Sequence, residues 1–479
     1  MNSTISLPDI WPVACHTDYV GEDSTFVAIK GLQKDGADFI PLALQKGART
    51  IVVQEGAFIA QSTHELIQAY QAQLLWVADV RKSLALLAAN AWENPALQLK
   101  IIGITGTKGK TTTAWLLYHL LKKAGISTAL LSTVKNKIND HEFATELTTQ
   151  QPDYLHAFFH TCMMHGVTYV VMEVAAQAVS LHRVAGITFD GIIFTNFAGA
   201  HGEFYATLQE YFQAKYFLFK QQSAQAKLII NGDDAKGTSL LKEYGGTSFG
   251  IAGAELDVKA IVYRSALNGL TLTLNEFGHL HTLACPALMG AFNVYNSIGA
   301  ASMAHQLGVP WATIAQAITT FIGVPGRLER YDLPNGAVCF IDQAHNPSSF
   351  AAVLSELRAA TDNLIVVSGA GGDRDKQMRP LLGSLMAQYG HTVIITSDNP
   401  RSENPADIID QIYAGVPEEK QAAVLIEVDR EKAIQKAYAC SRKGSIIALL
   451  GKGPQQYQMI GAVKYPFSEQ KIIKGLSAL

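Results

Sequence analysis

One segment near residue 100 constrains the fold more than any other part of the sequence. Residues 99–105 are expected to form a strand, and residues 111–124 place leucines at helical spacing before Gly125. A loop rich in glycine separates the two. This order of strand, loop and helix predicts one βα unit of a mostly parallel sheet.

The loop of this unit predicts a binding site for a nucleoside triphosphate. It contains, from position 103, the residues Gly103-Ile104-Thr105-Gly106-Thr107-Lys108-Gly109-Lys110-Thr111-Thr112. Glycine lets backbone N–H groups wrap phosphates at the positive end of the helix, Lys110 reaches the β and γ phosphates, and the Thr111 hydroxyl is placed to ligate magnesium. Ile104 stands where the strict spacing requires glycine, and the alternative is a glycine turn with an incidental lysine. We expect ATP and Mg²⁺ as cofactors.

The length of 479 residues suggests about three domains. Short strand and helix patterns before residue 99 predict a small N-terminal α/β domain over residues 1–98. Further strands are expected at 169–172 and 192–195, so we predict a central P-loop NTPase-like domain with a mostly parallel sheet over 99–325. A C-terminal Rossmann-like α/β domain is expected over 326–479.

Three strand candidates of the last domain each end in a polar loop. The strands are expected at 364–368, 392–396 and 446–450, and the loops that follow cover 369–376, 397–401 and 451–453. Open parallel sheets bind ligands beyond the carboxyl ends of their strands. These loops are therefore expected to line a binding site.

Charge and cysteine usage narrow the class of protein. The 38 Lys and Arg residues nearly balance the 41 Asp and Glu residues, so no global field favours nucleic acid or an anionic membrane. The five cysteines are scattered without a C-x-x-C pair, and no signal peptide or apolar run of 18 residues is evident. We expect a monomeric cytoplasmic protein whose partners are small molecules.

Several motifs together resemble the Mur ligases, the ATP-dependent, amide-forming enzymes of peptidoglycan precursor synthesis. Beside the glycine loop, they lie at residues 172–174, 182–184, 194–196, 290–296, 324–327, 371–376 and 398–401. The last two resemble the MurE type, which joins a diamino acid to UDP-N-acetylmuramoyl-L-Ala-D-Glu, and Arg401 is expected where that acid is meso-diaminopimelate. The resemblance implies that the N-terminal domain binds the UDP portion and the C-terminal domain the amino acid.

The resemblance also implies roles for residues around the phosphates. A carboxylate attacks the γ-phosphate to give an acyl phosphate and ADP, and an amine then displaces phosphate, so charge neutralisation dominates the chemistry. Lys110, Glu173, His201 and Lys215 are expected to be catalytic, with Thr111, Glu173, His201 and Lys215 as metal ligands. Lys215 matches a lysine that is carbamylated by carbon dioxide; the alternative is a solvated helix lysine. The nucleotide is expected to contact Gly106, Thr107, Lys108, Gly109, Lys110, Thr111, Thr112, Asn293, Asn296, Arg327 and Asp342.

The remaining candidates face the two organic substrates. Arg374 and Arg401 suit carboxylates because a guanidinium donates two parallel hydrogen bonds. The alternative for Arg401 is that residues 398–400 are only a turn before a helix capped by Asn404. The full set of expected substrate contacts is Thr148, Thr149, Arg183, Arg374, Asp398, Asn399, Arg401, Gly451 and Gln455.

The departures from the family pattern lie at substrate-facing positions. Ala175-Ala176-Gln177 replaces Ser-Ser-His, Asp18 lies near the expected uridine site, and Gln455 replaces a glutamate that receives the far ammonium of the diamino acid. Three hypotheses remain open at this stage. They are a MurE-type ligase adding meso-diaminopimelate, a divergent ligase with another acceptor and amine, and a nucleotide-binding pseudoenzyme, against which the retained lysines and Glu173 argue.

Overall fold

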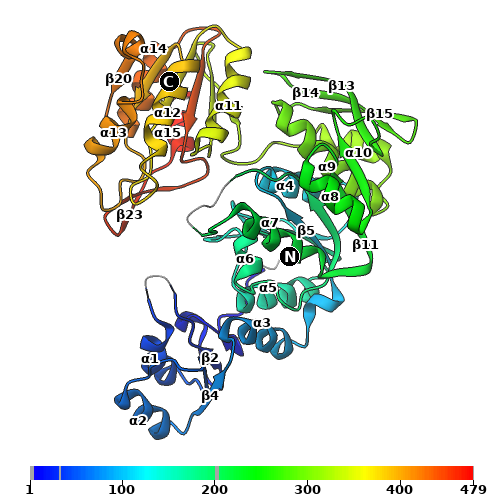
Figure 1. Cartoon of the computed structure of the whole chain (residues 1–479), viewed down its shortest axis with the longest axis vertical. Coiled ribbons are helices and arrows are strands. Elements are labelled where there is room, and N and C mark those ends of the chain that lie inside the picture. The colour runs from blue at the N-terminus through cyan, green and yellow to red at the C-terminus, as the bar shows by residue number, and fades with distance from the viewer. Residues whose placement is uncertain (1–4, 32–33, 200–203, 478–479) are drawn as a thin grey trace. The chain divides into compact units, whose positions relative to one another are not determined.

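The computed structural model describes residues 5–31, 34–199 and 204–477, and it forms α/β layers throughout (Figure 1). By backbone contacts the chain divides into two compact units. The first holds residues 1–261, 273–282 and 295–318, and the second holds 262–272, 283–294 and 319–479. The α/β class expected from the sequence is confirmed, whereas the boundaries at 98/99 and 325/326 remain a prediction.

The N-terminal sheet has four parallel strands in chain order. They are β1 (Val13–Ala14), β2 (Thr25–Val27), β3 (Thr50–Gln54) and β4 (Gln73–Val77). Helix α3 (Val80–Ala91) packs Leu84 and Ala88 against one face. Helices α1 (Ile40–Gln45) and α2 (Gln61–Ala69) bury apolar side chains on the other.

The central sheet is built around the strand that the sequence predicted. Strand β5 (Lys100–Thr105) lies in parallel between β9 (Tyr169–Glu173) and β10 (Phe189–Phe194). The strand order is β15-β14-β13-β12-β11-β10-β5-β9-β6-β7-β8. The other strands are β6 (Thr128–Leu131), β7 (Asn136–Ile138), β8 (His141–Phe143), β11 (Gln222–Asn231), β12 (Thr247–Gly250), β13 (Val258–Ala266), β14 (Gly269–Glu276) and β15 (His279–Cys285). The loop after β5 therefore leaves the middle of a large sheet at its carboxyl edge.

Helices cover this sheet because its strands are apolar on both faces. Leu155 and Phe158 of α5, Leu218 and Phe219 of α7, and Leu240 of α8 enter one buried cluster with strand residues. Helix α4 carries the predicted leucines and contacts α10, where the His119 ring lies 2.9 Å from the Ala317 carbonyl. The helices are α4 (Lys110–Lys123), α5 (Pro152–Met164), α6 (Ala176–Ser180), α7 (Leu208–Phe219), α8 (Ala235–Tyr244), α9 (Ala291–Gln306) and α10 (Trp311–Ile318).

The C-terminal sheet has the order β16-β17-β21-β18-β19-β20, antiparallel only at β16. The predicted strands are confirmed as β18 (Leu364–Ser368), β19 (Thr392–Ile395) and β21 (Ile446–Leu450). The others are β16 (Glu329–Asp332), β17 (Val338–Asp342) and β20 (Val424–Ile426), with a separate hairpin of β22 (Tyr457–Ile460) and β23 (Val463–Pro466).

Alternate residues of these strands face opposite helix layers, as the pleat requires. Val366 and Ala448 pack on α11 (Pro347–Ala359), α12 (Met378–Tyr389) and α13 (Pro405–Tyr413), all labelled in Figure 1. Val367 and Leu449 pack on α14 (Arg430–Cys440) and α15 (Glu469–Ser477). With both faces covered, the carboxyl edge of this sheet is left for ligands.

None of the described helices has the length and apolar character needed to span a lipid bilayer.

Candidate active site

The backbone of the phosphate loop depends on two glycines. Gly106 and Gly109 have φ of 144° and 85°, values that favour glycine. A Cβ on Gly106 would lie 2.0 Å from Thr195 Oγ1, and one on Gly109 would lie 2.3 Å from Asn296 Oδ1. Gly109 is also the residue before helix α4. The loop is therefore shaped by conformations and close contacts that larger residues cannot adopt.

Two lysines from different helices converge on this loop. Lys110 Nζ donates to the carbonyl oxygens of Gly106 (2.9 Å) and Thr107 (3.0 Å), and Lys215 Nζ donates to the same Gly106 oxygen (2.8 Å). Lys215 is 1% exposed, and its Nζ lies 4.6 Å from the centre of the Tyr211 ring. Burial holds the pKa of Lys215 well below its ordinary value, and the charge of Lys110 lowers that pKa further. The Lys110 cation beside backbone N–H groups at the start of a helix suits a polyanion.

Glu173 lies at the end of β9 and faces the start of α4. Its Oε2 accepts from the Thr111 hydroxyl at 2.9 Å, and its Oε1 accepts from the Thr133 backbone N–H at 2.8 Å. The Glu173 side chain is buried, with 1% exposure. Hydroxyl and carboxylate oxygens are ligands that Mg²⁺ prefers, so Thr111 and Glu173 fit this ion. Thr133 is a contact that the sequence analysis missed.

The predicted substrate residues Thr148, Thr149 and Arg183 lie beside Glu173. Thr133 Oγ1 donates to Thr148 Oγ1 at 3.1 Å, and Thr149 Oγ1 donates to the Glu173 carbonyl at 2.9 Å. Arg183 Nη1 donates to the Thr149 carbonyl at 2.8 Å. The structure thus brings these residues together with the phosphate loop in one unit.

Asn196 and Asn296 brace the loop. Asn196 accepts from the Lys108 N–H at 3.0 Å and donates to the Lys108 carbonyl at 3.1 Å. Asn296 Oδ1 accepts from Thr113 Oγ1 at 3.3 Å. Asn196 belongs to the motif at 194–196, but the sequence analysis gave it no role.

Two further predicted residues of the first unit are described, and a third is not. Thr112 is buried on the first turn of α4. Burial lowers the pKa of Lys108, whose backbone is held by Asn196. His201 lies outside the described residues.

The second unit carries the other predicted nucleotide contacts. Asn293 Nδ2 donates to the Met289 carbonyl at 2.7 Å, within α9 and the turn before it. Asp342 accepts from the backbone N–H groups of Leu328 and Ala344, both at 2.7 Å, and burial raises its pKa while Arg327 opposes that rise. Arg327 Nη1 donates to the Gly326 carbonyl at 3.2 Å. Asp342 and Arg327 therefore lie together at the end of β17.

The predicted amino-acid residues lie at the carboxyl edge of the C-terminal sheet. Arg374 is exposed on the β18–α12 loop (residues 369–377), and Arg401 lies on the β19–α13 loop (residues 396–404). Arg401 Nη1 donates to the Gly372 carbonyl, which joins the two loops. Asn404 caps α13 by accepting from the Ala406 N–H at 3.1 Å, so the predicted cap is also present.

A buried lysine supports the β19–α13 loop. Lys452 Nζ is fully buried, lies 3.5 Å from Asp398 Oδ1 and donates to Asn399 Oδ1 at 3.0 Å. Gly451 lies against Asp398, since a Cβ there would be 2.5 Å from Asp398 Oδ2. Lys452 was not predicted, although it lies between two glycines at the end of a strand.

Because Lys452 can only donate, it also fixes the amide orientations beside it. Asn399 Oδ1 accepts from Lys452 and from the Met459 N–H (2.9 Å), so Asn399 Nδ2 donates to Gln455 Oε1 at 2.9 Å. The Gln455 carbonyl oxygen therefore accepts a hydrogen bond from within the protein.

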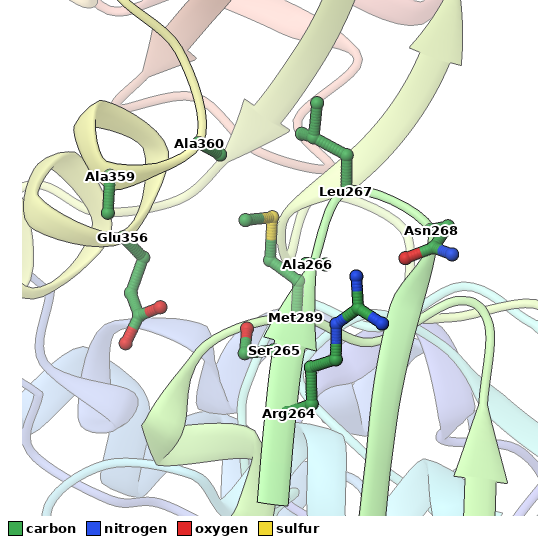
Figure 2. A pocket seen from close by; sticks show the side chains of 9 residues that line it. All are labelled: Arg264, Ser265, Ala266, Leu267, Asn268, Met289, Glu356, Ala359 and Ala360. Carbon is green, nitrogen blue, oxygen red and sulfur yellow. The ribbon is translucent and has the colours of Figure 1, made fainter.

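A pocket of about 480 Å³ lies elsewhere in the second unit (Figure 2). Arg264 of β13, Met289 and Glu356 of α11 are among the residues that line it. Glu356 Oε1 already accepts from the Ala291 N–H at 2.9 Å. The pocket contains none of the predicted site residues.

Comparison with known proteins agrees with this geometry. Three family models match, namely the Mur ligase family catalytic domain over residues 14–92, the Mur ligase middle domain over 104–304, and the Mur ligase glutamate ligase domain over 326–453. The chain belongs to the Mur ligase family. The resemblance is thus confirmed, and this Mur ligase is an ATP-dependent, ADP-forming enzyme that acts on small molecules.

Named relatives cover nearly the whole chain. A UDP-N-acetylmuramoyl-L-alanyl-D-glutamate--2,6-diaminopimelate ligase of Clostridium perfringens is 36% identical, with 95% of this chain and 92% of the relative covered. The protein of that name from Caldanaerobacter subterraneus is 34% identical with the same coverage. A solved structure of a ligase with this name has a TM-score of 0.67 at 25% identity and covers 98% of this chain and 95% of its own.

Proposed function

We propose that this Mur ligase joins 2,6-diaminopimelate, in its meso form, to UDP-N-acetylmuramoyl-L-alanyl-D-glutamate, with ATP and Mg²⁺. The observation that carries the proposal is the set of relatives that bear this name at 36% and 34% identity over 95% of the chain. The phosphate loop, with its two lysine amines, and the Arg374 and Arg401 loops supply the groups that such a reaction needs.

The proposed reaction has two steps. A carboxylate oxygen of the acceptor attacks the γ-phosphorus of ATP, the bond to the β-phosphate oxygen breaks, and ADP leaves. The amine nitrogen then attacks the acyl phosphate, and the tetrahedral intermediate expels inorganic phosphate as the amide forms. Negative charge builds up on phosphate oxygens first and on the carbonyl oxygen second, so fixed cations accelerate both steps.

We assign the first step to the phosphate loop. Lys110 turns from the Gly106 and Thr107 carbonyls toward the β and γ phosphates, and backbone N–H groups at the start of α4 hold their oxygens. Thr111 and Glu173 would hold Mg²⁺. When bound, this ion supplies charge neutralisation at the phosphates. His201 remains a proposed contributor to a second metal position.

Lys215 is proposed to act as a carbamate. Its lowered pKa favours the neutral amine, whose nitrogen lone pair attacks carbon dioxide and then releases a proton. The product is an anion at a position where Lys110 supplies the opposite charge. This is a physical reason for burying a lysine there, and it argues against a solvated helix lysine.

The acceptor is proposed to bind residues of the first unit, and the amine residues of the second. Thr148, Thr149 and Arg183 lie next to Glu173 and suit the acceptor peptide. Arg374 and Arg401 suit the carboxylates of the amino acid. Asp398, Asn399 and Gly451 are proposed to form the base of this amino-acid site. Asn293, Asn296, Arg327 and Asp342 are proposed contacts of the nucleotide.

The cell compartment and the assembly state are also proposals. All five cysteines are unpaired, which suits a reducing cytoplasm. That the protein acts as a monomer stays a prediction.

One observation favours a second candidate, the same chemistry with a different amine. Gln455 presents N–H donors instead of the carboxylate that would accept from an ammonium. A charged hydrogen bond contributes roughly 1.5 to 3 kcal/mol, which corresponds to about tenfold to a hundredfold in affinity. An amino acid with a single amino group is therefore the alternative substrate for this site.

The test is phosphate release by the purified chain with ATP, Mg²⁺ and UDP-muramoyl dipeptide. We expect meso-diaminopimelate to stimulate release and to give a tripeptide product, identified by mass. Stimulation only by another amino acid would support the second candidate. Absence of stimulation by every amine, with ATP still bound, would contradict ligase function on this acceptor.

A further inference from the structure

Arg374 and Arg401, the two guanidinium groups of the proposed amino-acid site, lie on separate loops. Two carboxylate-binding groups are useful only if their spacing is fixed to within about 0.5 Å. Arg401 has φ of 50°, and Asp373, next to Arg374, has φ of 53°. Both conformations are unfavourable for residues with a Cβ, so surrounding contacts must hold them.

Arg379 and Glu403 connect these two loops through hydrogen bonds. Arg379 Nη1 donates to Glu403 Oε2 at 2.9 Å, and Nη2 donates to Glu403 Oε1 at 2.8 Å, a bidentate pair. Glu403 belongs to the β19–α13 loop, while Arg379 lies on the first turn of α12 and also donates to the Gly371 carbonyl at 3.3 Å. The Arg379 side chain is 1% exposed.

The same carboxylate reaches the strained residue of the other loop. Glu403 Oε1 accepts from the Asp373 backbone N–H at 2.6 Å, and the Asp373 carboxylate accepts from the Ser402 hydroxyl. The backbones of the two loops are also joined directly, because the Gly372 N–H donates to the Asn399 carbonyl at 2.9 Å. Removing the Glu403 carboxylate would therefore take away the acceptor of the Asp373 N–H and weaken the hold on the backbone that carries Arg374.

Stability alone does not explain this pair. A cation on the first turn of a helix opposes the helix dipole, and Arg379 Nε has no hydrogen-bond partner among the described residues. Buried ion pairs are often no more stabilising than apolar residues of the same volume. A planar, two-bond pair does fix distance and orientation, which an apolar contact does not.

We propose that Arg379 and Glu403 are positioning residues, a strut with a buried guanidinium that sets the placement of Arg374 relative to Arg401 for binding of the amino acid. The inference rests on the proposed function of this edge as the amino-acid site. Neither residue touches the substrate in this account, so both act through the loops that they join.

The test compares Glu403→Gln with Arg379→Lys and a matched control. Glu403→Gln keeps the shape but removes the charge, while Arg379→Lys keeps the charge but loses the two-bond geometry. The control is Asp332→Asn, which removes a carboxylate paired to Arg330 in the same unit, on β16, a strand separated from β18 and β19 by β17 and β21. For each protein, KM for meso-diaminopimelate, KM for ATP, kcat and backbone hydrogen exchange are measured.

We expect both strut variants to raise KM for the amino acid at least tenfold, with KM for ATP changed less than twofold and kcat less than threefold. Hydrogen exchange should become faster in residues 369–376, and the control should match the wild type. Unchanged KM and unchanged exchange in these loops would overturn the proposal. A fall in kcat and melting temperature with both KM values unchanged would also overturn it, since that is the result of a purely structural role.

Failure of the proposed function would look different. If the wild type shows no amine-dependent phosphate release, the assignment of the substrate fails, while hydrogen exchange still decides whether the strut holds the loops. If Glu403→Gln does not fold, Arg379→Lys decides the KM comparison.

Discussion

At the scale of single residues, the phosphate loop is dominated by two lysines that share one acceptor. Lys110 and Lys215 both donate to the Gly106 carbonyl oxygen. The charge of Lys110 lowers the pKa of Lys215, which burial already holds below its ordinary value. We expect Lys110 to contact the β and γ phosphates of ATP.

Lys110→Ala should reduce ADP formation on the order of 100-fold or more, because a fixed cation at the transferred phosphoryl group is lost. The matched control is Lys123→Ala at the exposed end of the same helix. Steady-state ADP release with acceptor and amine present measures both. Turnover of Lys110→Ala at the control rate would contradict the assignment of the phosphate loop.

Lys215 gives a prediction about pH and carbon dioxide. Burial lowers its pKa and so favours the neutral amine, the form that reacts with carbon dioxide. We expect bicarbonate to raise the rate of carbon-dioxide-depleted enzyme, and Lys215→Ala to abolish both the rate and the response. Lys220→Ala, at the exposed end of the same helix, should keep both. A full rate for Lys215→Ala would exclude the carbamate.

At the scale of elements, the loop between β5 and α4 depends on Gly109. Gly109→Ala would face a φ of 85° and an Asn296 oxygen 2.3 Å from the new Cβ. Gly125→Ala, after the other end of α4, has a similar φ of 80° but no atom within 4 Å. Both variants carry a backbone penalty of about 1 to 2 kcal/mol. Only Gly109→Ala should lose ATP binding by calorimetry, and equal ATP affinity of the two variants would contradict the loop assignment.

Helix α5 supplies a pH-dependent contribution to stability. Burial lowers the pKa of His156 from 6.5 to about 4, and its Nδ1 has no hydrogen-bond partner among the described residues. Between these pH values the unfolded chain binds a proton that the folded chain does not, so stability falls as pH falls below 6.5. At pH 5 the loss relative to pH 7.5 is about 2 kcal/mol.

Urea unfolding of wild type, His156→Gln and His165→Gln at both pH values measures this contribution. His165 caps the exposed end of α5 and serves as the control. The pH difference should shrink by about 2 kcal/mol only in His156→Gln. The same pH difference in all three proteins would show that His156 does not supply it.

Elements were more predictable from the sequence than contacts. The β5 strand, the α4 helix and the Asn404 cap follow from apolar spacing and local side-chain chemistry. Each of these features depends only on residues that are close together in the sequence. Thr133, Asn196 and Lys452 were missed because their partners are brought near by strand order, which no local pattern specifies. The Arg379–Glu403 pair was missed for the same reason.

At the scale of the whole molecule, one chain combines a triphosphate loop in its first unit with paired guanidinium loops in its second. Separate sites suit a ligase, since ATP reacts with the carboxylate in the first step and the amine reacts with the resulting acyl phosphate in the second. The claim common to every step is that the terminal phosphoryl group of ATP passes to a carboxylate oxygen of the acceptor.

Oxygen labelling tests that transfer most directly. The acceptor UDP-muramoyl dipeptide is prepared with ¹⁸O at both oxygens of each of its two free glutamate carboxylates and incubated with ATP, Mg²⁺, meso-diaminopimelate and the purified chain in unlabelled water. We predict that the released inorganic phosphate carries one ¹⁸O atom, because the bond that breaks in the second step lies between the acyl carbon and that oxygen. Phosphate released without label would show that water, and not the carboxylate, attacks ATP, and would contradict the account.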